Sequence, residues 1–131
     1  MVMRTNVKNK IILALGSNTD QEMNMMKVEQ LLKDLFGEVA FSTQLWTMPI
    51  GLTSEKFINC LAFIKTTHGL PQVSRAIKQL ERKCGNTKAE RSKGLIKMDI
   101  DILKFNDTIF HEDDWERNYI KTLMKQDPFD I

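Results

Sequence analysis

The order of hydrophobic patterns along the chain constrains its fold more strongly than any other feature of the sequence. Apolar residues recur at helical spacing in two segments, 19–37 and 71–85. Four further segments are rich in strand-forming residues, and they lie at 10–15, 39–47, 57–67 and 96–105. The resulting order predicts an α+β fold of the ferredoxin-like β-α-β-β-α-β type, in which an antiparallel sheet carries both helices on one face. The other face of the sheet is then left open.

The ends of the expected helices carry their own signals. Thr19 and Glu22 have the spacing of a capping box at the start of the first helix. Pro71 suits the first turn of the second helix, where its missing N–H costs no hydrogen bond. A short final helix is expected within 113–123, because acidic residues at its start can cap the free N–H groups.

Composition limits the class of protein. Of the 131 residues, 42% are hydrophobic and 27% charged, so we expect one globular domain over 1–131. The net charge of +2 is too small to attract a polyanion by whole-molecule charge alone, so any anion site must be local, and we expect no nucleic-acid partner. Cys60 and Cys84 match no disulfide or metal motif, and no segment is long enough to cross a membrane. We therefore expect a reduced, cytoplasmic setting, no membrane partner and a monomer.

Two carboxylates in the last strand are the most informative chemical feature. Residues 97–102 read Lys-Met-Asp-Ile-Asp-Ile, and the strand period of two puts Asp99 and Asp101 on one face. Their neighbours Met98, Ile100 and Ile102 then point into the core. Carboxylates about 7 Å apart along a strand can bind one or two divalent ions, with oxygen ligands suited to Mg²⁺. The simpler alternative is an edge strand with a solvated polar face.

A basic segment precedes this strand. It contains six cations within sixteen residues, namely Arg82, Lys83, Lys88, Arg91, Lys93 and Lys97. A flexible basic loop opposite a metal-binding carboxylate pair is what a nucleoside triphosphate requires. The segment lacks the glycine-rich Walker pattern, so any phosphate site here is of another kind. The alternative is an ordinary solvated helix end.

The strand at 57–67 carries a possible reader of a flat heterocycle. Phe57 and Asn59 share one face, and an amide beside an aromatic ring can recognise a ring with hydrogen-bonding edges. The alternative is that the ring belongs to the core. His68 and His111 have no nucleophile nearby in the sequence, so we expect structural or surface roles for both.

Five motifs in the same order resemble those of the 6-hydroxymethyl-7,8-dihydropterin pyrophosphokinase family. They are Ala14-Leu15-Gly16-Ser17-Asn18, Thr47-Met48-Pro49-Ile50-Gly51, Phe57-Ile58-Asn59, Lys88-Ala89-Glu90-Arg91 and Met98-Asp99-Ile100-Asp101-Ile102. All five lie within residues 11–105. The resemblance implies a ferredoxin-like fold and a folate-pathway reaction, in which the β,γ-pyrophosphoryl group of ATP moves to the hydroxymethyl oxygen of the pterin and AMP is released.

The resemblance also implies roles for individual residues. Asp99 and Asp101 would hold two Mg²⁺ ions and serve in catalysis with Arg91. The pterin would be bound by Asn59, Phe57, Thr47 and the backbone at Ile50. The ATP side would be formed by Glu81 and Ile102, with Lys88, Lys93 and Lys97 supplying charge in place of arginines.

Several positions depart from the family pattern. Asn86 and Thr87 stand where the family usually has arginines, and Ile96 replaces another; Lys93 replaces a tryptophan. We also expect the chain to lack the family's C-terminal Pro-His segment and the Arg-Gly-Phe region after it, which supply ATP contacts and a second ring against the pterin. Tyr119 and Phe129 are the candidates for a substitute ring.

Three functional hypotheses follow. The first is a short, divergent pyrophosphokinase, and the second is a catalytically weak paralogue that binds a pterin or a nucleotide. The third is an RNA-recognition module, which shares the β-α-β-β-α-β order. That module needs a characteristic aromatic motif on its third strand, and residues 56–61 do not supply it.

Overall fold

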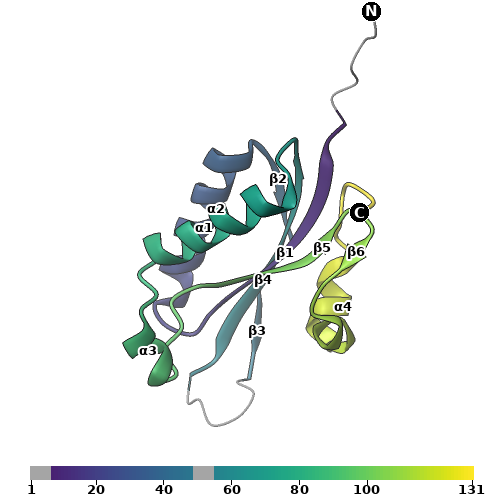
Figure 1. The fold of residues 1–131 in the computed structure, drawn as a ribbon. Helices are drawn as coiled ribbons and strands as arrows, with labels where there is room; N and C mark the ends of the chain where they lie inside the picture. Colours follow the sequence, from purple (N-terminus) through teal and green to yellow (C-terminus); the bar gives the residue numbers. More distant parts are fainter. Residues whose placement is uncertain (1–6, 49–54) are drawn as a thin grey trace, which may run out of the picture.

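The computed structural model describes residues 7–48 and 55–131. The strands are β1 (Asn9–Ser17), β2 (Glu38–Phe41), β3 (Leu45–Thr47), β4 (Phe57–Thr66), β5 (Asp99–Phe105) and β6 (Thr108–Ile109). The helices are α1 (Gln21–Phe36), α2 (Leu70–Lys83), α3 (Lys88–Ser92) and α4 (Asn118–Met124), and a 3₁₀ helix, η1, spans Glu112–Glu116. Figure 1 shows how these elements surround the sheet.

The strands form one antiparallel sheet with β1 near its centre. The order is β2-β4-β1-β5-β6, and β3 also pairs with β4. β1 is hydrogen-bonded to β4 along one edge and to β5 along the other. The predicted α+β fold is thus confirmed, with β2 and β3 together taking the place of the second expected strand.

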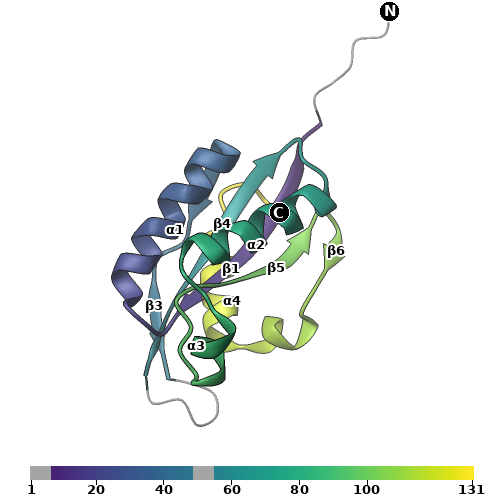
Figure 2. The same ribbon diagram turned by 60° about the vertical axis from the view of Figure 1, so that its left-hand side comes forward.

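α1 and α2 cover one face of this sheet, and Figure 2 looks onto that side. Alternate residues of the strands point toward the helices, as the period of two requires. The resulting core is fully or almost fully buried and includes Ile11, Leu13, Leu15, Met25, Val28, Leu32, Ile58, Ile64, Val73, Ile77, Met98 and Ile100. Met98 and Ile100 therefore anchor the start of β5, so that Asp99 between them points away from the helices.

The opposite face is not open, contrary to the expectation from the sequence. α4 lies across it, on the other side of the sheet from α1 and α2 (Figure 1). A second buried cluster joins the sheet to this helix and consists of Ile12, Leu61, Phe63, Leu103, Ile120 and Leu123. The sequence prediction missed this cover because a seven-residue helix has too few periodic positions to show which face it buries. The end of the face where the acidic strand begins lies outside this cluster and borders open space.

The expected strand over 39–47 is divided in two. Between β2 and β3, the Ser42 hydroxyl accepts a hydrogen bond from the Leu61 N–H at 2.8 Å, and the Ser42 N–H donates to the Leu61 carbonyl at 2.9 Å. The hydroxyl thus satisfies a backbone donor that a regular strand neighbour would otherwise satisfy. The chain can leave the ladder at Ser42 and re-enter it at Leu45.

The segment before β5 is also more structured than a polar loop. It contains α3, whose first N–H groups are capped by Thr87, since the Thr87 hydroxyl accepts from the Glu90 N–H at 3.1 Å. β5 begins at Asp99 and not at residue 96. Residues 88–92 therefore form a short helix, and the prediction of a loop is wrong for them.

The helix ends differ from the prediction in detail. α1 begins after Asp20, which has a left-handed backbone (φ 46°) and makes no capping bond with its side chain, so the expected capping box is wrong. In α2 the Gln72 side chain accepts from the Gly69 N–H at 2.9 Å. The expected final helix is η1 followed by α4. Within the described ranges, no helix is both long and apolar enough to cross a membrane.

Candidate active site

A cavity of about 620 Å³ lies between the uncovered end of the sheet and the segment from η1 to α4. β1, β3, β4 and β5 supply one wall, and residues 114–120 supply the other. The residues that line it with polar or aromatic groups include Thr47, Phe57, Asn59, Asp99, Asp101, Arg117 and Tyr119. We call this space the sheet cavity. It brings together residues from the two ends of the chain.

The floor of the sheet cavity is a row of cross-strand neighbours. Gly16 of β1 is paired with Asn59 of β4 on one side and with Asp99 of β5 on the other. Neighbouring strands lie about 4.8 Å apart, so Asn59 and Asp99 stand roughly 10 Å apart with only a glycine between them. A Cβ atom at Gly16 would lie 3.6 Å from both Asn59 Oδ1 and Phe57 Cδ1. The missing side chain therefore leaves a flat floor between an amide and a carboxylate.

The amide of Asn59 is held in a defined orientation. Its Nδ2 donates to Thr47 Oγ1 at 2.8 Å and to the Leu45 carbonyl at 3.1 Å. The side chain is 6% exposed, and among the described residues none donates to its Oδ1. A buried acceptor held by bonds to its own NH₂ group is ready to accept a hydrogen bond from a ligand.

Two aromatic rings line the sheet cavity from opposite walls. Phe57 extends from β4, and Tyr119 stands at the start of α4. The Tyr119 side chain is uncharged at neutral pH, and burial raises the pKa of its hydroxyl further above the usual value. Phe129, the other candidate ring, instead lies under the Lys65 ammonium, 4.6 Å from it. Ile50 lies outside the described residues.

A second cavity of about 400 Å³ lies at the outer edge of β5, beside α2, and we call it the edge cavity. Its lining comes from α2, the acidic strand and the residues that follow β6, and includes Ser74, Glu81, Arg91, Ile102, Phe110 and His111. The predicted nucleotide-side residues Glu81 and Ile102 thus lie together with the predicted catalytic cation Arg91. β6 pairs only with Lys104 and Phe105, which leaves the edge of β5 open beside Ile102.

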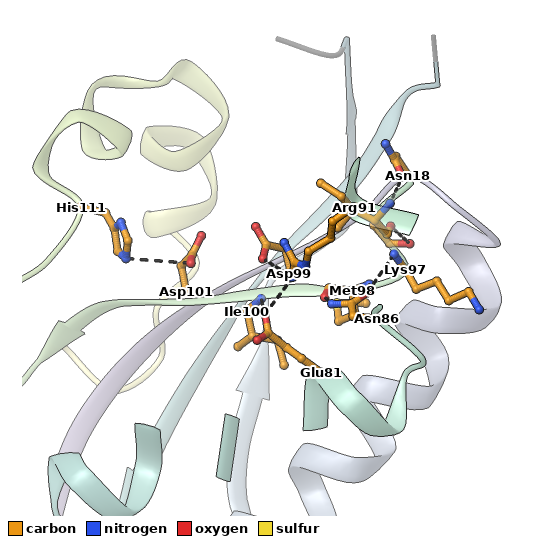
Figure 3. A network of polar contacts seen from close by, with 12 residues as sticks. Asn18, Glu81, Asn86, Arg91, Lys97, Met98, Asp99, Ile100, Asp101 and His111 are labelled. Atoms are coloured by element: carbon orange, nitrogen blue, oxygen red, sulfur yellow. Dashed lines mark hydrogen bonds and ion pairs between the residues drawn. The ribbon is translucent and has the colours of Figure 1, made fainter. Parts of the chain in front are cut away.

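Asp99 and Asp101 line both cavities, and no other described residue does. Figure 3 shows the two carboxylates on the same side of β5. No cluster of three or more metal-ligating side chains occurs in the described part of the chain. Two carboxylates nevertheless suit Mg²⁺, which usually takes one or two protein carboxylates and completes its shell with phosphate oxygens and water.

The charges around this pair are unevenly balanced. Arg91 lies 3.2 Å from an Asp99 oxygen and 3.7 Å from a Glu81 oxygen, whereas the one described residue that pairs with Asp101 is His111, at 3.9 Å. Burial, and then the neighbouring carboxylate of Asp99, raise the pKa of Asp101 above its usual value. Burial is also the main reason why the pKa of Glu81 is raised. A cation near Asp101 would offset the cost of burying this carboxylate and its repulsion by the Asp99 carboxylate.

The predicted lysines do not reach these cavities. Lys88 and Lys93 are exposed at the two ends of α3, and neither lines either cavity. Lys97 points away from Asp99 (Figure 3) and pairs with Glu90 at 3.3 Å. Arg91 is thus the basic residue of the segment that the fold brings to the carboxylates.

Three lining residues were missed or undervalued from the sequence. Local pattern does not point to Arg117, a structural or surface role is expected for His111, and Tyr119 is one of two candidate rings. Residues 110–119 have no periodic pattern that predicts where they fold back. The order of residue types could have pointed to them. Phe110-His111 is followed by Arg117-Asn118-Tyr119, just as the Pro-His segment of the resembled family is followed by its Arg-Gly-Phe region.

Comparison with known proteins identifies the family. A model of the 7,8-dihydro-6-hydroxymethylpterin-pyrophosphokinase (HPPK) family matches residues 12–126. A comparison with curated protein sequences gave no match. The family comprises pyrophosphokinases of folate biosynthesis that bind a pterin and ATP and use Mg²⁺. Because the family model covers most of the chain, including residues that line both cavities, the resemblance noted from the motifs is confirmed, and the chain belongs to the HPPK family.

Proposed function

We propose that this chain transfers the β,γ-pyrophosphoryl group of ATP to the hydroxymethyl oxygen of 6-hydroxymethyl-7,8-dihydropterin and releases AMP. The observation that carries this proposal is that the sheet cavity and the edge cavity meet at Asp99 and Asp101. A reaction between two bound substrates needs such a junction, where the attacking oxygen and the phosphorus are held in line. Because the groups at this junction are carboxylates, the transferred group is expected to arrive with a metal ion.

The pterin would occupy the sheet cavity. Asn59 Oδ1 would accept a hydrogen bond from an N–H of the pterin edge, while Thr47 keeps the amide in place. Phe57 and Tyr119 would lie against the two faces of the ring, with the Gly16 floor allowing a flat molecule to sit close to the sheet. We also propose the backbone at Ile50 as part of this pocket, as the family resemblance implies.

The nucleotide would occupy the edge cavity. The Ile100 N–H points away from β1, because it donates to Glu81 at 2.9 Å. The Ile102 N–H, two residues on, faces the same edge and is available to a base. We propose that Arg91 and His111 contact the phosphates, and that Lys88, Lys93 and Lys97 attract the triphosphate from the adjacent surface.

Asp99 and Asp101 would hold two Mg²⁺ ions. The donor set fits, since both groups are carboxylates on one face and Asp101 lacks a close cationic partner among the described residues. The bound ions would neutralise the phosphate oxygens and the charge that develops on them. The hydroxymethyl oxygen attacks the β-phosphorus and gives up its proton to water, while the bond from this phosphorus to the bridging oxygen breaks and AMP leaves with that oxygen. Asp99 and Asp101 serve this step by fixing the positions of the charges.

The C-terminal part of the chain would complete both pockets. We propose that Arg117-Asn118-Tyr119 corresponds to the Arg-Gly-Phe region of the family, and His111 to the histidine of its Pro-His segment. Support comes from the lining of the cavities, since Arg117 and Tyr119 face the sheet cavity and His111 the edge cavity. On this proposal the expected loss of these groups does not apply.

The direct test is an assay of AMP formation from Mg-ATP and 6-hydroxymethyl-7,8-dihydropterin, with product identified by mass. Asp101→Asn is the inactive control, and Asp107→Asn, in the exposed turn after β5, is the matched substitution that leaves turnover intact. AMP formation that requires both the pterin and Mg²⁺ supports the proposal. Wild-type protein that binds pterin and Mg-nucleotide but forms no AMP would exclude it.

One observation favours a second candidate, a paralogue that binds the pterin and transfers slowly. The cation that would orient the phosphates, Arg91, is paired with Asp99 and Glu81, while Lys88 and Lys93 lie away from the cavities. The same assay distinguishes the two, since the paralogue would bind pterin tightly and form AMP slowly or not at all. An RNA-recognition role is disfavoured, because α4 covers the part of the sheet where bases would stack.

We also propose a cytoplasmic location and a monomeric state. The location is supported by the free, buried thiols of Cys60 and Cys84 and by the need for ATP as a co-substrate. A monomer is proposed because both cavities are formed from one copy of the chain. Sedimentation of the purified protein tests the monomer.

A further inference from the structure

Residues 94–98 lead into β5, and no strand in the described part of the chain pairs with them. Side chains satisfy their backbone polar groups instead. On the β1 side, the Asn18 side chain takes over. Its Nδ2 donates to the Gly94 carbonyl at 2.7 Å, and its Oδ1 accepts from the Ile96 N–H at 2.7 Å. The Asn18 N–H also donates to the Ile96 carbonyl at 2.9 Å. Asn18 is 2% exposed, so these bonds are made in a buried site, where they are costly to lose.

On the α2 side, Asn86 holds the next two residues. Its Oδ1 accepts from the Lys97 N–H and from the Met98 N–H, each at 3.1 Å, and its Nδ2 donates to the Met98 carbonyl. Glu81 continues the row by accepting from the Ile100 N–H (Figure 3). Glu81, in the last turn of α2, and Asn86, three residues after the helix ends, thus replace a strand along the outer edge of residues 97–100.

The backbone after α2 is shaped to make this possible. Gly85 has φ +92°, a conformation that strains other residues, and it turns the chain so that Asn86 faces β5. A Cβ atom at Gly85 would also lie 3.3 Å from the Lys97 side chain. Asn86 is therefore held between a tight turn and the strand that carries Asp99.

We propose that Asn86 is a positioning residue for the metal-binding carboxylate Asp99. It lines neither cavity, and acts by fixing both polar groups of Met98, the residue immediately before Asp99. On the other edge, Asp99 is paired with Gly16 of β1. Asn86 thus determines how far the start of β5 can move away from β1. This inference rests on the proposed function, because Asn86 matters to catalysis only if Asp99 binds metal.

A merely structural role for Asn86 predicts a different result from a positioning role. Loss of a supporting residue around a metal ligand typically costs about 10- to 100-fold in metal affinity or activity. Loss of a structural bracket lowers stability alone. Ser42 offers the matched control, since its hydroxyl also braces a strand by accepting from the Leu61 N–H, but far from the carboxylates.

The experiment compares wild type with Asn86→Ala, Asn86→Asp and Ser42→Ala. Binding of Mn²⁺ with a non-hydrolysable ATP analogue is followed by electron paramagnetic resonance, pterin binding by calorimetry, and exchange of the amides of residues 97–100 by mass spectrometry. For Asn86→Ala we expect Mn²⁺ affinity to fall about tenfold or more, and amide exchange at 97–98 to accelerate. Pterin affinity should stay within about twofold, because the contacts of Asn59 are untouched. Asn86→Asp keeps an acceptor for both N–H groups and should restore slow exchange.

The outcomes distinguish a failure of the positioning role from a failure of the proposed function. Asn86→Ala with the Mn²⁺ affinity of wild type, or an equal loss in Ser42→Ala at the same thermal stability, overturns the role of Asn86 and leaves the proposed function intact. Wild type that binds no Mn-nucleotide complex overturns both. A loss confined to Asn86→Ala, with exchange slowed again in Asn86→Asp, supports the positioning role.

Discussion

The sheet cavity and the edge cavity share two carboxylates but differ in how ready they are for a ligand. In the sheet cavity the key amide, Asn59, has its donor group satisfied within the protein and its acceptor directed to the ligand space. In the edge cavity the key cation, Arg91, is already paired with Asp99 and Glu81. The first site is prepared for its ligand, whereas the second must exchange protein contacts for ligand contacts.

The difference has a structural cause. The sheet cavity is built on β1, β3 and β4, whose side chains are fixed by pairing and by two buried clusters. Arg91 comes from α3, a five-residue helix with no buried residue. A short exposed helix has little packing to restrict its motion, so its contacts rearrange at low cost. On the proposed function, the protein thus combines a rigid site for the uncharged ring with an adaptable site for the charged nucleotide.

The strongest test of the shared junction removes a carboxylate. Asp101→Asn keeps the shape but removes a metal-binding charge, and we expect turnover and Mg-dependent nucleotide affinity to fall by more than about 100-fold. Circular dichroism should show an unchanged fold, and pterin affinity should change little. Normal binding of Mg-nucleotide to Asp101→Asn would contradict the assignment of the junction.

The readiness of the sheet cavity is tested at Asn59. Asn59→Leu has similar volume but leaves the polar edge of the ligand unpaired, at a cost of about 1–3 kcal/mol, or roughly 5- to 150-fold in pterin affinity. Thr47→Val removes the hydroxyl that orients the amide and should cause a smaller loss in the same direction. Asn9→Leu, at the far end of β1, is the matched control. Calorimetry with the pterin measures all three, and unchanged affinity in Asn59→Leu would place the pterin elsewhere.

The paired state of Arg91 predicts effects of opposite sign. Arg91→Ala frees Asp99, so affinity for Mn²⁺ without nucleotide should rise by about 1.5- to 5-fold, the range of an exposed ion pair. Nucleotide binding and pyrophosphoryl transfer should fall, because the phosphates lose a cation. Wild-type nucleotide affinity should also decline between about 50 and 300 mM salt. If Mn²⁺ affinity falls in Arg91→Ala, the ion pair does not compete with the metal.

The smallest effect concerns pH and stability without metal. Because the pKa of Asp101 is raised in the folded protein, folding favours its protonated form. Its contribution to stability is complete below the unfolded pKa of 3.8 and is lost as pH rises through the higher folded pKa. Asp101→Asn should therefore melt slightly above wild type at pH 7 and show no advantage near pH 3. An equal difference in melting temperature at both pH values would indicate that burial does not disfavour the ionised form of Asp101.

Much of the architecture could be predicted from local pattern. The two helices and the strands that flank them follow from hydrophobic period, and the common face of Asp99 and Asp101 follows from the geometry of a strand. Asn59 and Phe57 were placed on one face by the same rule, and both line the sheet cavity. These predictions succeeded because each depends only on residues close together in the sequence.

Predictions that depended on long-range placement were less successful. Lys88, Lys93 and Lys97 are close to Asp99 in sequence, yet only Arg91 reaches it, because the turn of α3 orients one residue of the group toward β5. His111 is exposed, as expected for a surface residue, yet the fold also brings it within 3.9 Å of Asp101. Charge density along the sequence therefore indicated a site without showing which cation serves it.

The same division between local pattern and long-range placement applies to the two cavities. From the sequence alone follow the strand faces, the helix stripes and the family motifs, because backbone period and side-chain chemistry are local properties. The return of residues 110–120 across the sheet, the junction of the two cavities at Asp99 and Asp101, and the bracket made by Asn86 came only with the tertiary structure. They depend on contacts between distant segments, whose free energy is gained only when the whole core of β1, β4 and β5 has formed.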